Sequence, residues 1–180
     1  MRTMKSLVLV AGHAIPYRFD RLNRNEGWYL KFFQAGEGAL YLDHVKCGVI
    51  AAAQEADSLL IFAGGQTDAA PGLRSEGQGD WLAADYYKWF GHHEVSLRAT
   101  SEEFSLDSFQ DLLFGICRFR EVAGTYPEKI VGWVGNSWDH VSISTVERSG
   151  SLRAASFTWV PLARPYWRET CSLNGQGSLG

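Results

Sequence analysis

Short apolar runs alternate with helical patterns through the first three quarters of the chain. Residues 6–11 and 58–63 are apolar runs that stop at glycine, a pattern typical of strands buried on both faces of a parallel sheet. Weaker patterns at residues 96–100 and 129–134 predict two further strands. Helical spacing is predicted within residues 26–53, where residues 34–38 separate two helices or turns, and at residues 81–90 after a loop at residues 68–79.

The clearest helical pattern is at residues 106–123. Ser105 is its expected N-cap, Asp107 lies near the positive end of the helix dipole, and Gly124 and Pro127 end it. Strands that alternate with helices predict right-handed βαβ units. The expected fold is an α/β three-layer Rossmann-like sandwich with a mainly parallel sheet, which takes ligands outside the carboxyl ends of its strands.

Composition and charge narrow the class of protein. The chain has 180 residues, of which 46% are hydrophobic, so one domain with a sizeable core is expected. The net charge of -3 offers no basic surface to a polyanion, and we expect no nucleic-acid partner. No apolar run approaches the roughly 20 residues that span a bilayer, and the run after Arg2 and Lys5 lacks a signal-peptide cleavage site. We therefore expect a cytoplasmic protein without a membrane segment.

The two clearest strands end in glycine-containing polar turns, at residues 12–13 and 64–67. Glycine lets a ligand approach the backbone, and free N–H groups there hold an anion such as a phosphate or carboxylate. A plain tight turn explains such glycines about as often. The chain has neither the Gly-x-Gly-x-x-Gly nor the Gly-x4-Gly-Lys-Ser/Thr pattern, so NAD and ATP have no support and the cofactor stays open.

Carboxylates gather in two segments and are candidates for general acid and base work or for holding a hard metal ion. They are Glu76, Glu102, Glu103, Asp107 and Asp111. The alternative is helix capping and solvation, because acids in the first turn of a helix are favoured by its dipole.

Histidines and serines are the remaining candidates. The histidines show no zinc-ligand spacing, so no metal is expected. Only His13 lies at a strand end, where a histidine is more often structural or exposed than catalytic. Ser75 and Ser108 are candidate nucleophiles, but neither lies in a Gly-x-Ser-x-Gly elbow.

Several motifs occur in the order found in one known family. They are Leu9-Val10-Ala11-Gly12-His13-Ala14, residues 59–67, Ser75-Glu76-Gly77 and residues 102–121. Together they resemble the domain of unknown function 218 family, in particular its eukaryotic cytoplasmic branch, with the SanA-like and YdcF-like proteins as bacterial relatives. The resemblance runs from about Leu7 to Trp133 and implies the same Rossmann-like fold.

The resemblance implies a small-molecule site, although the family as a whole lacks an established reaction. On this chain the family's pocket motifs correspond to Gly64, Gly65, Gln66, Thr67, Ser75, Glu76, Glu103, Asp107 and Ser108. Two residues depart from the family pattern: Ala63 replaces the usual serine and Asp111 the usual asparagine. A charged, acceptor-only Asp111 would repel an anionic ligand.

The similarity stops after Trp133. If the serines use TCN codons, translation from the third base of the Gly135 codon permits Arg-Phe and Leu-His pairs like those with which the family continues. We therefore favour the hypothesis that residues 134–180 are a frame-shifted tail and that residues 1–133 form a sandwich incomplete at its C-terminus. A divergent but genuine ending is the alternative.

One expected function and two alternatives follow. We expect an enzyme that binds a small nucleotide-like or anionic metabolite, with Glu76 or Asp107 transferring a proton. The alternatives are a ligand-binding or regulatory module without turnover, favoured by Ala63 and Asp111, and an inactive truncated product. The candidate ligand-binding residues are Gly12, His13, Gly64, Gly65, Gln66, Thr67, Ser75, Glu103, Ser108 and Asp111.

Overall fold

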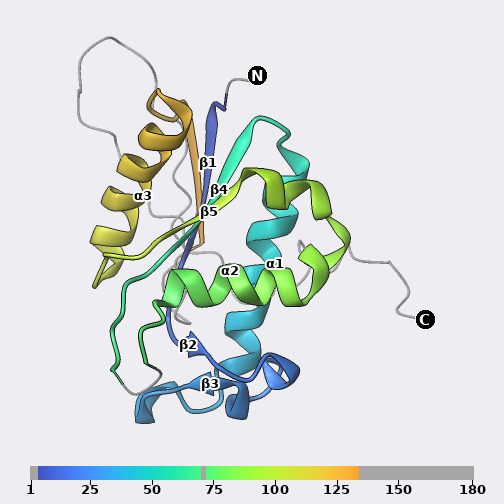
Figure 1. The fold of residues 1–180 in the computed structure, drawn as a ribbon, viewed down its shortest axis with the longest axis vertical. Helices are drawn as coiled ribbons and strands as arrows, with labels where there is room; N and C mark the ends of the chain where they lie inside the picture. Colours follow the sequence, from blue (N-terminus) through green and yellow to red (C-terminus); the bar gives the residue numbers. More distant parts are fainter. Residues whose placement is uncertain (1–3, 70–71, 134–180) are drawn as a thin grey trace, which may run out of the picture.

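A computed structural model describes residues 4–69 and 72–133 (Figure 1). Its strands are β1 (Ser6–Ala11), β2 (Ile15–Pro16), β3 (Trp28–Tyr29), β4 (Ser58–Ala63), β5 (Ala99–Glu102) and β6 (Lys129–Trp133). Its α-helices are α1 (Gly38–Gln54), α2 (Glu76–Tyr86) and α3 (Ser108–Ala123). Short 3-10 helices occupy Phe19–Arg21, Asn25–Gly27, Phe32–Gln34, Lys88–Gly91 and His93–Arg98.

Four parallel strands form the central sheet, in the order β5-β4-β1-β6. Ser6 of β1 pairs with Ser58 of β4 on one side and with Lys129 of β6 on the other, while β5 pairs with the second half of β4. The short strands β2 and β3 form a separate antiparallel pair. Figure 1 shows α3 on one side of the sheet and α1 and α2 on the other. The predicted α/β Rossmann-like sandwich is therefore confirmed.

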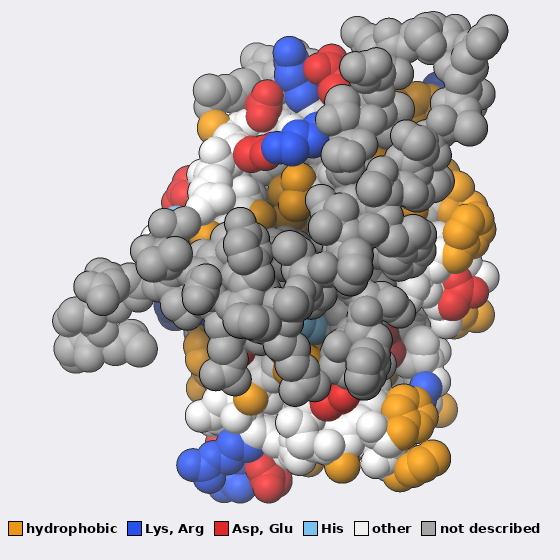
Figure 2. All heavy atoms as spheres, turned by 180° about the vertical axis from the view of Figure 1, so that it is seen from behind, with side chains coloured by type: hydrophobic (Ala, Val, Ile, Leu, Met, Phe, Trp, Pro, Cys, Tyr) orange, Lys and Arg blue, Asp and Glu red, His pale blue; other side chains and the backbone are white. Residues whose placement is uncertain are grey.

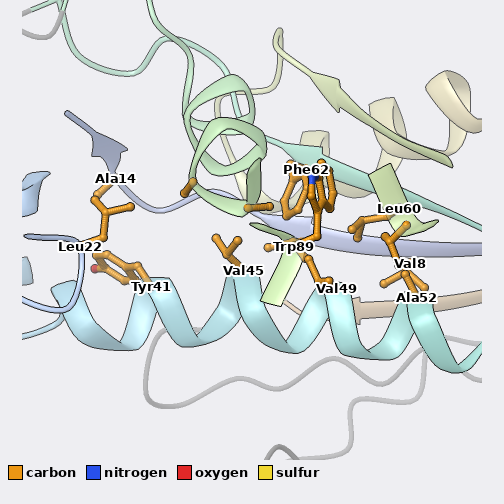
Figure 3. Packing of buried hydrophobic residues seen from close by; sticks show 14 of the residues in the cluster. Val8, Ala14, Leu22, Tyr41, Val45, Val49, Ala52, Leu60, Phe62 and Trp89 are labelled. Carbon is orange, nitrogen blue, oxygen red and sulfur yellow. The ribbon is translucent and has the colours of Figure 1, made fainter. Parts of the chain in front are cut away.

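Alternate side chains of the two central strands face opposite layers, as expected from the period of a strand. One core cluster packs against α1 and α2 and includes Val8, Val10, Leu60 and Phe62. Figure 3 shows Val45 and Val49 of α1 pointing toward the strand residues Val8, Leu60 and Phe62. The other cluster includes Leu7, Leu9, Leu59, Ile61 and, from α3, Phe119. Burial on both faces explains why these strands appear in the sequence as continuous apolar runs.

The predicted loop at residues 68–79 is wrong at its end, because α2 begins at Glu76. Ser75 is its N-cap, and its hydroxyl accepts a hydrogen bond from the Gln78 N–H at 3.0 Å. Gly77 brings the helix close to the sheet: a Cβ there would lie 2.5 Å from the Phe62 carbonyl oxygen and 2.6 Å from that of Glu102. Two of the glycines that suggested a loop, Gly77 and Gly79, are thus packing residues of a helix, whereas Gly72 lies in the loop before it.

Three further predictions need smaller corrections. Residues 26–37 form 3-10 turns and the strand β3 before α1, because Trp28 and Tyr29 pair with Pro16 and Ile15. The third strand begins at Ala99, after a 3-10 helix over His93–Arg98. The N-cap of α3 is Asp107 rather than Ser105; its carboxylate accepts the Gln110 N–H at 2.8 Å. Gly124 ends this helix as predicted, with φ at 77°.

Among the described residues, no helix combines the length and apolar character needed to cross a membrane. The hypothesis of a frame-shifted tail at residues 134–180, and with it the expected incomplete C-terminus, lies outside the described residues.

Candidate functional site

Glu76 occupies the carboxyl end of the sheet between β1 and β4. Its side chain lies against two glycines: a Cβ built on Gly12 would be 2.6 Å from the Glu76 Cβ, and one built on Gly64 would be 2.8 Å from it. The Glu76 Oε2 atom would be 2.8 Å and 3.1 Å from the same two positions. The space that the glycines leave is therefore filled by the side chain of Glu76.

The backbone N–H groups of three glycines in these turns are bonded within the fold and are not free to hold an anion. The Gly12 N–H donates to the Ala63 carbonyl at 2.6 Å, the Gly64 N–H to that of Glu102 at 3.0 Å, and the Gly65 N–H to that of Ser105 at 2.7 Å. The expectation of free N–H donors at these three glycines is therefore wrong. These bonds join the turn after β4 to the ends of β1 and β5.

Glu76 is a buried carboxyl, with 6% of its surface exposed. Burial raises its pKa, while the hydroxyl of Thr67, which donates to Oε1, and the charge of Lys31 act in the opposite direction. A carboxyl with a raised pKa holds its proton more tightly than an exposed glutamate does, which suits a group that accepts and returns a proton.

Asp80 lies one turn after Glu76 in α2 and is 4% exposed. Burial raises its pKa well above the usual range, and the charges of Glu76 and Asp111 add to the shift. Its Oδ1 atom has no hydrogen-bond partner within the described part of the chain. Burial without a hydrogen-bond partner for Oδ1 thus favours the protonated form of Asp80 over the charged one.

Ser105 bridges two further buried carboxyls. Its Oγ lies 2.6 Å from Oε2 of Glu102 and 2.6 Å from Oδ1 of Asp111, and both acids are 5% exposed. A hydroxyl has one proton and donates to one carboxyl only, so the second bond requires a proton on the other carboxyl. The Phe104 N–H donates to the free oxygen of Glu102 at 2.7 Å.

Asp111 is the carboxyl of this bridge that holds the proton. Burial and the charges of Glu76, Glu102 and Asp107, opposed by the hydrogen bond from Ser105, raise its pKa to about 7. About half of the charge expected from an aspartate at this position is therefore neutralised at neutral pH. The capping alternative is wrong for Asp111, which is buried and bonded to Ser105, and right for Asp107, which is exposed and caps α3.

The His13 side chain packs against two other rings beside this end of the sheet. Its ring stacks on Tyr41 of α1 with centroids 5.2 Å apart and meets His44 edge-on at 5.4 Å. Burial lowers the pKa of His13 to about 4, so the imidazole is neutral at neutral pH. The Gln34 amide donates to the His13 carbonyl at 2.6 Å and ties this turn to the segment before α1.

The other predicted residues have partners within the fold. The Gln66 amide donates to the Gly72 carbonyl, and Ser75 caps α2. Oε1 of Glu103 accepts from the Ser101 hydroxyl at 2.7 Å, and Ser108 is the exposed first residue of α3. The structure thus brings Gly12, Gly64, Thr67 and Glu76 together, and it uses Ser75, Glu103 and Asp107 in local hydrogen bonds.

Sequence reasoning left Asp80, Ser105 and Lys31 out of the site, and it named Glu102 among the candidate carboxylates but not among the ligand-binding residues. Asp80 is four residues after Glu76, a spacing that places both acids on one helix face. This spacing was missed because residues 68–79, which include Glu76, were assigned to a loop. Ser105 was assigned to the helix cap, and no local pattern shows that it joins Glu102 to Asp111.

No group of three histidine, cysteine, aspartate or glutamate side chains in the described ranges is arranged to hold a metal ion. The acids of this site are instead buried carboxyls, namely Glu76, Asp80, Glu102 and Asp111. The chain matches no protein-family model, and comparisons with curated proteins and with solved structures give no significant match.

Proposed function

We propose that this protein is a small-molecule enzyme in which Glu76 transfers a proton at the carboxyl ends of β1 and β4. One observation carries the proposal: the Glu76 carboxyl lies against Gly12 and Gly64, with burial raising its pKa and the Thr67 hydroxyl holding one oxygen. A group with this placement and proton affinity suits general acid and base work.

The surroundings of Glu76 limit the chemistry of the ligand. The glycine N–H groups are bonded to carbonyls, and Asp80 and Asp111 interact electrostatically with Glu76. We propose that a neutral or cationic group of the metabolite meets Glu76. An anionic part, as expected for a nucleotide-like molecule, would meet Lys31, the cation whose charge acts on Glu76.

The test is a ligand screen followed by one variant. Nucleotides, neutral polyols and amines are first screened by thermal shift on the full chain, and hits are then followed by NMR for turnover. With Glu76→Gln we expect turnover to fall by about 10²–10⁴-fold, the usual share of general acid–base catalysis, with ligand affinity unchanged. Asp107→Asn is the matched control, because this second candidate acid caps α3 on the surface.

Loss of turnover in Asp107→Asn, with turnover retained in Glu76→Gln, would assign the proton-transfer role to Asp107.

The second candidate function is a binding module without turnover. It is favoured by the 6% exposure of Glu76 and its bond to Thr67, which also suit a structural carboxyl. Ligands that bind but are never converted by the unaltered protein would establish that module. An inactive truncated product would show neither binding nor turnover.

Membership of the domain of unknown function 218 family and a cytoplasmic location are also proposals. They rest on the ordered motifs, which resemble the eukaryotic cytoplasmic branch of that family. Cell fractionation with an antibody to the native protein tests the location.

A further inference from the structure

A groove lies between β5 and one face of α3, and Glu76 is not among the residues that line it. Its volume is about 540 Å³, within the range of roughly 300–1,000 Å³ that is usual for small-molecule sites. The lining residues are Ser101 and Glu102 of β5, Glu103 and Phe104 of the following turn, and Phe114, Cys117, Arg118 and Glu121 of α3. The last four recur at helical spacing and therefore share one face of the helix. The groove thus has the size to hold a small molecule.

The groove is acidic. Among the described residues that line it, Glu102, Glu103 and Glu121 carry carboxylates and Arg118 is the one cation. The guanidinium of Arg118 is already engaged: its Nη1 atom lies 3.1 Å from the Glu121 carboxylate, and its Nη2 atom donates to the Thr100 hydroxyl at 3.3 Å. Neither Glu102 nor Glu103 forms an ion pair with any residue that the structure describes. The described part of the chain therefore supplies no cation to balance these two carboxylates.

Glu103 is the carboxylate that a ligand can reach. Glu102 is 5% exposed, and its two oxygens are bonded, one to the Phe104 N–H at 2.7 Å and the other to Ser105 Oγ at 2.6 Å. Glu103 is half-buried, and its Oε1 atom accepts from the Ser101 hydroxyl at 2.7 Å. A carboxylate accepts about four hydrogen bonds, so Glu103 keeps acceptor capacity for a donor on a ligand.

Two phenylalanine rings supply apolar surface beside these carboxylates. Phe104 is 82% exposed and Phe114 is half-buried. Figure 2 shows acidic side chains among hydrophobic ones along its right margin, the side on which α3 lies in that view. The face of an aromatic ring attracts a cation through its quadrupole. Carboxylates and rings in one groove thus match a ligand that carries a positive charge on an apolar body.

Other classes of ligand fit the groove less well. An anion would meet three carboxylates, and the charge of Arg118 is already held by Glu121. A neutral apolar molecule would displace water from Glu103 without replacing its hydrogen bonds. Within the described ranges, no group of acids, histidines and cysteines is arranged to hold a metal ion. An organic cation balances the charge and covers the rings together.

We propose that the groove between β5 and α3 binds a small organic cation, in which an ammonium group is attached to an aromatic or aliphatic body. The ammonium group donates to the Glu103 carboxylate, and the body packs against Phe104 and Phe114. This site is separate from the proton transfer proposed for Glu76, and the two are tested independently.

An NMR titration of the full chain, labelled with nitrogen-15, tests the site. The probe is 2-phenylethylamine, which is a cation at neutral pH, and 2-phenylethanol is its neutral counterpart of similar size. We expect the amine to bind roughly tenfold more tightly than the alcohol, because it adds a hydrogen bond to a charged group. The amide signals that shift should be those of β5, the turn after it and α3. Equal affinities for the amine and the alcohol would overturn the proposal.

Matched variants separate the two contacts of the cation. Glu103→Gln should weaken binding of the amine by roughly tenfold, whereas Glu94→Gln, at an exposed glutamate outside the groove, should leave it unchanged. Phe104→Leu keeps apolar surface without the ring and should weaken the amine by about threefold. Phe109→Leu is its control, because Phe109 is 72% exposed and does not line the groove. Equal weakening by a variant and its control would show that the groove does not hold the cation.

Protection of Cys117 gives an independent measurement. Cys117 is exposed and lines the groove, so bound amine should slow its alkylation by iodoacetamide, as followed by peptide mass spectrometry. The protection should persist in Glu76→Gln, because Glu76 lies outside the groove. An unchanged rate of alkylation at saturating amine would contradict the proposal, and so would protection that is lost in Glu76→Gln, because the cation would then bind at Glu76.

Discussion

At the scale of single residues, the glycines after β1 and β4 make room for an acid of the protein itself. Gly12 and Gly64 are small because the Cβ of Glu76 occupies the place where their own Cβ atoms would be. Asp80 of α2 and Asp111 of α3 interact electrostatically with Glu76, and Glu102 of β5 interacts with Asp111. The net charge at this end of the sheet therefore depends on how many of these acids are protonated.

The first prediction concerns the pH dependence of stability. The folded pKa of Asp111, about 7, lies above its ordinary value of 3.8. Its stabilising contribution is fully present below about pH 4 and is lost as pH rises to about 7, because only the unfolded chain releases the proton easily. The total is on the order of 4 kcal/mol, at about 1.4 kcal/mol for each pH unit.

In Asp111→Asn the amide donates to Ser105 as the protonated acid does and cannot titrate. We expect its free energy of unfolding to fall less between pH 5 and pH 8 than that of the unaltered protein, as measured by urea denaturation. Asp107→Asn makes the same substitution at the exposed cap of α3 and should keep most of the original slope, because the charge of Asp107 is the smallest of the causes that raise the pKa of Asp111. Equal slopes for all three proteins would show that the carboxyl of Asp111 is ionised in the fold.

At the scale of elements, α2 positions the site through its first turn. Ser75 begins the helix, Glu76 enters the end of the sheet, and Gly77 lies against the carbonyls of Phe62 and Glu102. Residues 75–80 thus cap the helix, position the site and pack the helix against the sheet. Its glycine content is explained by the packing distance between α2 and the strands.

The second prediction tests this close packing. Gly77→Ala raises helix propensity, but its Cβ would lie within 2.6 Å of two backbone carbonyl oxygens that cannot move independently of the sheet. We expect a net loss of roughly 1–3 kcal/mol in the free energy of unfolding, as for overpacked cores. Gln78→Ala, at the exposed next position, should be neutral or slightly stabilising. A stabilised Gly77→Ala protein would show that α2 lies farther from the sheet.

Sequence patterns predicted the strands better than the site. The bounds of β1 and β4 agree with the apolar runs, because a strand buried on both faces needs apolar residues at consecutive positions. Glu76 and Asp111 were named from motifs and composition. Ser105 was misassigned because its partners depend on how the end of β5 meets α3, a tertiary contact without a local period.

At the scale of the whole molecule, the sheet divides the core into two unequal layers. The cluster facing α1 and α2 contains Trp89, Phe62, Val45 and Val49 with many neighbours, whereas the cluster facing α3 is smaller and has Phe119 as its one buried aromatic side chain among the described residues. The second layer depends on one helix, and that helix also carries Asp111.

The third prediction follows from this asymmetry. Phe119 is fully buried against the strands, so Phe119→Ala should lower the free energy of unfolding by roughly 3–5 kcal/mol. The loss should be accompanied by faster hydrogen exchange along α3, with the amides of α1 keeping their protection relative to global unfolding. Val122→Ala, three residues later on an exposed face, should change both quantities little. If α1 and α3 lost protection equally, the two layers would unfold as one unit, and α3 would move away from the site only on global unfolding.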